Sequence, residues 1–285
     1  MILIDFSNVI IGSIMVAHKV PDEERFGEDF IRHLVLNSIR SYRNKHKTKY
    51  GEIVICTDFH SSWRKDVFPF YKAHRKKARE KQKTETGMDW SALFDTISRI
   101  IVELDTFFPY KVIRVAHAEG DDVIAVLARS FNEPSLIVSS DKDFTQLHKH
   151  KWVKQYSPLK QKIVRGDDPY KYLIEHTIRG DKGDGIPNAL SADNCLVEGV
   201  RQKAISKKKV AIWSEMDPND FDEDLKRGWD RNKTLIDFNC IPKEINDDIL
   251  NQYNKEKNHQ RGQLMNYFIK HRLKYLMENM GDFTK

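Results

Sequence analysis

The chain has 285 residues, of which 40% are hydrophobic and 32% charged, and a formal net charge of +6 at pH 7. This length allows one large domain or two modest ones, and the apolar content is sufficient for a core, which excludes global disorder. Three widely spaced cysteines without a CxxC pair exclude a disulfide framework and a cysteine zinc site, and no apolar run reaches membrane-spanning length.

Strand and helix patterns alternate through the first half of the chain. Residues 1–6 form a buried apolar run typical of a strand, and residues 30–42 repeat apolar positions at helical spacing. Three more strands follow, at 52–57, 112–116 and 136–140, with helices at 90–107 and 119–131. This alternation predicts an α/β fold with a mainly parallel central sheet flanked by helices.

The remaining segments complete this organisation. A short helix at 143–148 and a helix at 170–179 follow the last of these strands, and strand signals disappear after Gly180. We therefore expect an α/β domain over residues 1–180 and a separate helical region over residues 181–285. Residues 59–90 are highly charged without a strand pattern and form a basic insert in the first domain.

Acidic residues gather where the predicted strands end. Because parallel strands end at one edge of a sheet, residues scattered in sequence converge there. Six carboxylates follow the predicted strands, and the segment RGDKGD adds two more, which gives Asp5, Asp58, Glu119, Asp122, Asp141, Asp143, Asp181 and Asp184. So many carboxylates stay ionised together only beside cations, and oxygen-rich sites suit Mg²⁺, for which Mn²⁺ can substitute.

A single acid after a strand has an ordinary explanation, since Asp is a common turn former and helix N-cap. For Asp121 or Asp122 alone, a cap is favoured over a metal ligand by roughly two to one. Repetition at one edge of the sheet favours the metal site. Adjacent helical residues point about 100° apart, so we assign Asp122 as a ligand and Asp121 as a supporting residue.

The basic insert interleaves cations with aromatic rings. Basic side chains bind phosphates, and rings stack on unpaired bases. The candidates for nucleic-acid contact are Arg64, Lys65, Tyr71, Lys72, Arg75, Lys76 and Arg79. The alternatives are a solvated charged helix and, for Tyr71, an anchor that fixes the insert to the domain.

Five motifs occur in a characteristic order: LIDFSN, TDF, AEGDDVIAVLA, SSDKDFTQL and RGDKGDGIPN. In this order they resemble the structure-specific 5′ nucleases, the flap endonuclease family, and within it the ribonuclease H members of T-even bacteriophages. The resemblance extends over nearly the whole chain. It implies a metal-dependent 5′→3′ exonuclease and flap endonuclease that removes RNA primers and adjacent DNA during lagging-strand replication.

The resemblance also implies roles for individual residues. A first Mg²⁺ ion would be surrounded by Asp5, Asp58, Asp122 and Asp141, and a second cluster would consist of Glu119, Asp143, Asp181 and Asp184. Two ions about 4 Å apart would activate a water and support the leaving oxygen. The basic insert would arch over the site, where Lys72 and Arg75 would stabilise the transition state.

The second half of the chain departs from the family in one respect. Relatives hold duplex DNA with a helix–hairpin–helix element and often a monovalent cation, but the usual hairpin pattern G-h-G-x-K-T is absent. Arg201 and Lys203 remain candidates for contact with duplex phosphates. The expected partners are DNA and RNA–DNA hybrids with 5′ ends or flaps, and the phage family suggests a single-strand-binding protein and a sliding clamp. We expect the protein to be a monomer in the cytoplasm of the host cell and not to bind a membrane.

Two other functions fit part of the pattern. A PIN-type ribonuclease would share the sheet and fewer acids, but it would lack the long basic insert and the helical second half. A non-catalytic nucleic-acid-binding relative would gain nothing from eight acids that face phosphate. Cleavage that EDTA abolishes, as opposed to binding that EDTA leaves intact, distinguishes the enzyme from the binding protein.

Overall fold

The first strand shows how the sequence builds the core. In the computed structural model of the protein, which describes residues 1–17, 21–257 and 261–284, β1 spans Ile2–Asp5 and is buried throughout. Ile2 and Ile4 belong to one apolar cluster, and Leu3 belongs to another. Because successive side chains of a strand point to opposite faces, this apolar run requires cover on both faces of the sheet.

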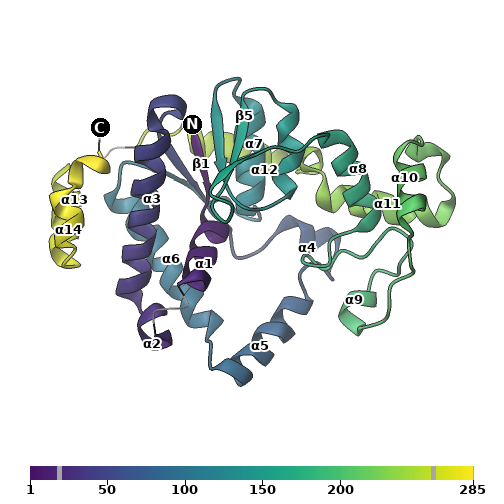
Figure 1. The fold of residues 1–285 in the computed structure, drawn as a ribbon, viewed down its shortest axis with the longest axis horizontal. Coiled ribbons are helices and arrows are strands. Elements are labelled where there is room, and N and C mark those ends of the chain that lie inside the picture. Colours follow the sequence, from purple (N-terminus) through teal and green to yellow (C-terminus); the bar gives the residue numbers. More distant parts are fainter. Residues whose placement is uncertain (18–20, 258–260, 285) are drawn as a thin grey trace.

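The sheet has six strands in the order β3-β2-β1-β4-β5-β6 (Figure 1). Five of them are parallel, namely β1, β2 (Ile53–Cys56), β3 (Lys111–Ile113), β4 (Ser135–Val138) and β5 (Val153–Ser157). The edge strand β6 (Lys162–Val164) is antiparallel to β5. The predicted parallel sheet is confirmed, and the carboxyl ends of its five parallel strands reach one edge.

Helices cover both faces of the sheet. One face carries α1 (Phe6–Val16), α3 (Glu28–Tyr50), α6 (Trp90–Phe107), α13 (Arg261–Lys270) and α14 (Lys274–Glu278), with the short α2 (Asp22–Arg25) before α3 and the 3-10 turn η4 (Met280–Asp282) at the end. The other face carries α7 (Gly120–Ser130), the 3-10 helix η1 (Asp143–Lys149), the 3-10 turn η3 (Phe238–Cys240) and α12 (Lys243–Asn254). The sheet is therefore the middle layer of three.

A smaller helical cluster lies beside this three-layer core. It consists of α8 (Pro169–Arg179), α10 (Lys207–Ser214) and α11 (Glu223–Ile236), with α9 (Cys195–Glu198) and the turn η2 (Pro218–Asp220) in its loops. Figure 1 shows α9, α10 and α11 at one end of the molecule and α13 and α14 at the other. The helical region expected over residues 181–285 is thus divided, because α12, α13 and α14 pack on the sheet.

The basic insert leaves the core after β2 and returns at α6. It contains α4 (Trp63–Val67) and α5 (His74–Thr86), and α5 buries none of its residues. Figure 1 shows α5 set apart from the sheet. The helix α6 has the predicted bounds, and Asp89 caps it by accepting hydrogen bonds from the amides of Ser91 and Ala92.

The hairpin of β5 and β6 was not predicted. Its strands are short and mix polar with apolar residues, so they lack the apolar run that marks the interior strands. Gln155 is buried in β5 because its side-chain amide donates to the carbonyls of Ser139 and Asp141. Among the described residues, no helix combines the length and the apolar character needed to cross a membrane.

Candidate metal centre and nucleic-acid interface

Four carboxylates meet at the carboxyl ends of β1, β2 and β4, and we call them the first acidic group: Asp5, Asp58, Asp121 and Asp141. Asp5 ends β1, accepts a hydrogen bond of 2.6 Å from the Ser139 hydroxyl and caps α1. Asp58 follows β2 and accepts from Ser7 at 2.7 Å and from the Gly120 amide at 2.8 Å. The loop after β4 folds back on Asp141, whose carboxylate accepts from the amide of Asp143 at 2.9 Å.

The first acidic group carries more negative charge than its surroundings neutralise. Burial, together with the charges of Asp58 and Asp141, raises the pKa of Asp5 to about 7. Burial and the charges of Asp5 and Asp141 also raise the pKa of Asp121, although Lys72 opposes this rise. Carboxylates held together in this way favour either protons or a bound cation.

The structure corrects the assignment of Asp121 and Asp122. Asp122 is fully buried, and its carboxylate accepts hydrogen bonds from Arg64, from the Trp63 indole and from the Glu119 amide. Asp122 therefore forms a capping box at the start of α7 and an ion pair with Arg64, away from the first acidic group. Asp121 on the same turn interacts with Asp5 and Asp141 instead. The two adjacent acids do point in different directions, as the sequence argument expected, but Asp121 and not Asp122 lies beside the other members of the first acidic group.

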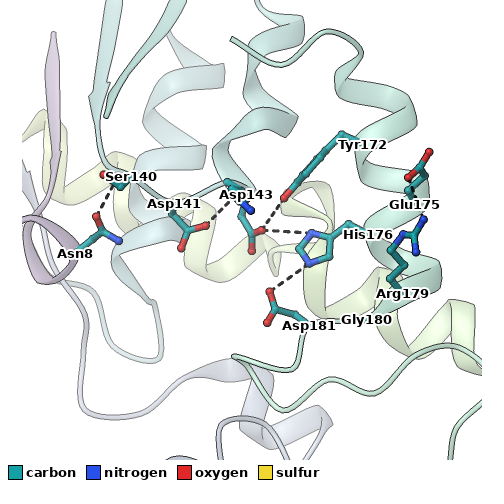
Figure 2. Close-up of a pocket in the computed structure, with 11 residues that line it drawn as sticks. Asn8, Ser140, Asp141, Asp143, Tyr172, Glu175, His176, Arg179, Gly180 and Asp181 are labelled. Atoms are coloured by element: carbon teal, nitrogen blue, oxygen red, sulfur yellow. Dashed lines mark hydrogen bonds and ion pairs between the residues drawn. The ribbon is translucent and has the colours of Figure 1, made fainter. Parts of the chain in front are cut away.

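We call Asp143 and Asp181 the second acidic group. A histidine that sequence reasoning missed, His176, lies between them. Figure 2 shows His176 of α8 between Asp143 and Asp181. Its Nδ1 lies 3.3 Å from Asp143 and its Nε2 lies 3.3 Å from Asp181, while the Tyr172 hydroxyl donates to Asp143 at 3.2 Å. Ligand atoms from Asp143, His176 and Asp181, one from each residue, lie close enough together to hold one metal ion. Burial raises the pKa of Asp143 to about 7, and the charge of His176 opposes this rise.

Glu119 and Asp184 contact cations of the basic insert. Lys72 donates to Glu119 at 2.5 Å and lies 3.5 Å from Asp184, and Arg75 donates to Asp184 at 2.6 Å. Burial alone would raise the pKa of Glu119, but Lys72 and Arg64 lower it to about 2. These two acids are therefore neutralised by side chains of the protein.

The structure brings Lys72 to the acids at a conformational cost. Its backbone φ is +55°, in the left-handed region that non-glycine residues seldom adopt, and its amide donates to the Asp184 carbonyl at 2.7 Å. Opposite it, Gly185 has a φ of +75°, and a Cβ there would lie 3.0 Å from the Phe70 carbonyl. The RGDKGD segment and the start of the insert are thus locked together.

Two predicted nucleic-acid contacts are wrong because their side chains are buried. Arg64 is 3% exposed, pairs with Glu119 and Asp122, and donates to the Leu235 carbonyl. Tyr71 is 2% exposed, and its hydroxyl lies 2.9 Å from Glu119 and 2.7 Å from Asp184. Tyr71 is therefore the anchor that the sequence left as its alternative.

The remaining predicted cations of the insert line an open hollow of 770 Å³ between α5 and α6. Lys65, Lys72, Arg75, Lys76 and Arg79 border it. The Arg79 guanidinium lies over two rings of its wall, 5.6 Å from the Trp90 centroid and 4.8 Å from that of Phe94. Burial lowers the pKa of Arg79, and no carboxylate of the described residues forms an ion pair with it.

Arg201 and Lys203 lie in a different hollow. It measures 630 Å³, and Arg179 and Lys182 line it together with these two residues. Arg179 and the neighbouring Gly180 also line the pocket of the second acidic group, so this basic hollow adjoins that group.

The residues present fit divalent cations. The first acidic group offers only carboxylate oxygens, which are the ligands that Mg²⁺ and Mn²⁺ prefer. Its raised pKa values indicate that the described side chains around it do not neutralise it fully. The second acidic group adds one imidazole, which first-row transition metals accept more readily than Mg²⁺ does.

Two protein-family models together match most of the chain. Residues 30–171 match the model of the 5′–3′ exonuclease N-terminal resolvase-like domain, and residues 170–283 match that of the T4 RNase H C-terminal region. The ribonuclease H of Enterobacteria phage T4 is 35% identical over 296 aligned residues, which cover 99% of this chain and 95% of that protein.

Other relatives match a smaller part. Flap endonuclease Xni of a Shewanella species is 33% identical over 44% of this chain and 47% of its own length. Among solved structures, the T5 5′-exonuclease with bound zinc has a TM-score of 0.59 at 13% identity and covers 89% of this chain and 98% of its own. The T5 flap endonuclease in complex with DNA and metal ions has a TM-score of 0.61 at 15% identity, with 89% and 99% covered. At such identities the likeness shows the fold.

Proposed function

Because this chain belongs to the 5′–3′ exonuclease family that includes phage T4 ribonuclease H, it is a metal-dependent 5′ nuclease, and we propose that it hydrolyses RNA–DNA and DNA duplexes from 5′ ends and at 5′ flaps. The observation that carries this proposal is the first acidic group, where three carboxylates from strand ends and one from the first turn of α7 face one another without enough cations. Only a phosphate-directed metal site explains such a group beside a basic insert.

We assign the first acidic group as ligands of one Mg²⁺ ion, with Asp121 in the place first given to Asp122. Asp143 and Asp181 are assigned to a second ion. When bound, divalent ions supply an activated water and neutralise charge on the phosphate and the leaving oxygen. The hydrogen bonds from Ser139 to Asp5 and from the Gly120 amide to Asp58 hold these carboxylates in place before metal binds.

Lys72 and Arg75 are assigned to the scissile phosphate. Lys72 lies beside Glu119 and Asp184, and Arg75 lies beside Asp184, with side chains 20% and 39% exposed. Each has a neighbouring carboxylate that fixes its position, so the cation needs little reorganisation to meet the negative charge that develops on phosphate. Because these carboxylates pair with the two cations, the first acidic group is neutralised only in part, by the charge of Lys72.

Two basic hollows are assigned to the two parts of a branched substrate. The hollow between α5 and α6 suits a single-stranded 5′ end, because Arg79 offers charge and the Trp90 and Phe94 rings offer stacking surfaces. The hollow with Arg201 and Lys203 suits duplex phosphates, because its cations can contact the backbone without reading bases.

The family of the chain supports a role in replication, in which the enzyme would remove RNA primers and adjacent DNA from lagging strands. In this role it would act in the host cytoplasm beside the phage single-strand-binding protein and the sliding clamp. The similarity over 99% of the chain favours this role over that of a PIN-type ribonuclease.

The test uses flap, nicked and RNA–DNA hybrid substrates labelled separately at the 5′ and the 3′ end. With Mg²⁺ we expect short products from the 5′ end only, and with EDTA we expect binding without cleavage. Asp121→Asn should remove the cleavage. Binding without cleavage by the wild-type protein in both Mg²⁺ and Mn²⁺ would show that it is a nucleic-acid-binding relative without chemistry.

A further inference from the structure

A second group of cations lies on the flank of the sheet, outside every assignment made above. The segment LHKHKWVK runs from the end of η1 into the start of β5, and its lysines Lys149, Lys151 and Lys154 surround a hollow of 250 Å³ together with Arg165. We call this the edge hollow. No aspartate or glutamate is among the residues that line it.

These four cations form no ion pair with any described residue. Lys149 instead lies 6.0 Å from the centroid of the Tyr170 ring, which is 67% exposed. Elsewhere on the surface, lysines of this protein commonly find carboxylates, as Lys171 does with Glu215 at 3.4 Å. Four unpaired cations around one hollow repel each other, and a polyanion would relieve that repulsion.

A chain of hydrogen bonds connects the edge hollow to the loop that carries Asp141. The neutral ring of His148 accepts from the Gly166 amide at 2.8 Å and donates to Gln155 at 3.0 Å. Gln155 in turn donates to the Asp141 carbonyl at 2.6 Å. The position of the edge hollow is thereby fixed relative to Asp141 of the first acidic group.

A groove joins the edge hollow to the acidic groups. This groove of 540 Å³ shares Arg165 with the edge hollow and shares Asp141 and Lys142 with the pocket of the second acidic group. Four cations and four acids line this groove: Lys142, Lys160, Arg165 and Lys171 against Asp141, Asp167, Asp168 and Glu175. Four cations and no acid line the edge hollow, so the net positive charge rises away from the acidic groups.

The distance along this route can be estimated from β5. The strand runs from Val153 beside the edge hollow to Ser157, at the edge of the sheet where the acidic groups lie. Four rises of about 3.3 Å give a separation of about 13 Å. That length corresponds to about four base pairs of a duplex, at about 3.4 Å per base pair.

We propose that the edge hollow binds the phosphate backbone of a second duplex arm. This arm would extend from the acidic groups along β6. It would lie at the start of α8, whereas Arg201 and Lys203 lie at the end of α8. The inference rests on the proposed function, because it presumes a branched or nicked substrate at the acidic groups. The edge hollow acts on affinity alone, since it lies about four base pairs from the scissile phosphate.

The test uses a variant with three changes, Lys149→Gln, Lys151→Gln and Lys154→Gln. A matched control changes three exposed lysines of the C-terminal part, Lys255→Gln, Lys270→Gln and Lys274→Gln, and so removes the same charge. Dissociation constants are measured in EDTA at several salt concentrations, with nicked duplexes whose two arms are shortened in turn from twelve base pairs to three.

We expect the variant to bind the long-armed substrate at least about fivefold more weakly than the control, with a salt slope lower by about three. The difference in affinity between variant and control should vanish when the arm that reaches the edge hollow is cut to three base pairs, and not when the other arm is cut. Equal affinities of variant and control on every substrate overturn the proposal, and so does a loss that is the same for all arm lengths. Absence of wild-type cleavage in Mg²⁺ would contradict the proposed function instead, because this binding assay needs no metal. The melting temperature of the variant checks its folding, and the single change Arg165→Gln repeats the test if the triple variant unfolds.

Discussion

Asp5 offers the sharpest test of the idea that the first acidic group awaits a metal ion. In the metal-free protein its pKa is raised to about 7, mainly by burial and then by Asp58 and Asp141, from an ordinary value of 3.8. A carboxyl group whose pKa is higher in the folded state destabilises the fold once it must ionise. Stability is therefore greatest below pH 4 and falls as the pH rises through about 7.

The size of this effect follows from the shift. Each pKa unit corresponds to about 1.4 kcal/mol, so ionisation of Asp5 in the folded protein costs about 4 kcal/mol as an upper limit. Asp5→Asn removes the charge and leaves a side chain that still caps α1. Without metal, we expect the variant to be more stable than the wild type by about 2 kcal/mol at pH 5 and by up to about 4 kcal/mol at pH 8.

The assay is urea unfolding in EDTA from pH 5 to 8, repeated with Mg²⁺. The exposed Asp95→Asn on α6 serves as the control and should give a difference that is independent of pH. Mg²⁺ should stabilise the wild type at pH 8 and the Asp5→Asn variant much less, because a bound ion favours the folded state only where its ligands are complete. A free-energy difference between Asp5→Asn and wild type that stays constant from pH 5 to 8 would refute the electrostatic reasoning.

Three further substitutions test the assigned roles. Asp121→Asn should abolish Mg²⁺-dependent cleavage but retain binding in EDTA, and wild-type cleavage by this variant would contradict the assignment of Asp121. Asp122→Asn should instead lower the free energy of unfolding by about 3 kcal/mol, because it weakens the buried ion pair with Arg64. Lys72→Ala should lower the single-turnover rate at saturating substrate by about 10²- to 10³-fold, and a change in affinity alone would contradict its catalytic role. Arg79→Ala should weaken binding of a substrate with a single-stranded 5′ end by about tenfold and leave a nicked duplex unaffected, so equal losses on both would place Arg79 outside the path of the single strand.

The sequence predicts those features that depend on a repeated pattern. Strand runs such as Ile2–Asp5 are buried on both faces, so their apolar character is continuous and easily recognised. The strand ends in turn predict which acids converge. The β5–β6 hairpin escapes this reasoning because Gln155 is buried through hydrogen bonds to carbonyls and not through apolar character.

Side-chain direction and pairing could not be predicted in the same way. Asp121 and Asp122 differ by one position, and only the buried position of Arg64 decides which of them faces the first acidic group. Arg64 itself belongs to a run of cations that suggests a nucleic-acid surface, yet its guanidinium lies inside the protein. His176 showed no ligand spacing in the sequence, because its partner Asp143 lies far before it, at the start of η1, and Asp181 lies in the segment after α8.

The cations near the acids imply that the two proposed metal positions differ in strength. Among the described residues, Lys72 is the cation whose charge acts on the first acidic group, so most of the negative charge of this group remains for a divalent ion. In the second acidic group, His176 already bridges Asp143 and Asp181, and the neighbouring Asp184 is paired with Arg75. Mg²⁺, which prefers oxygen ligands to imidazole, must compete there with a positive His176 ring, whose charge opposes its own. Calorimetry with Mg²⁺ should therefore resolve one stronger and one weaker binding event, and the weaker one should strengthen in His176→Gln. If the stronger event is lost in His176→Gln but kept in Asp121→Asn, the order of the two sites is the reverse of the one argued here.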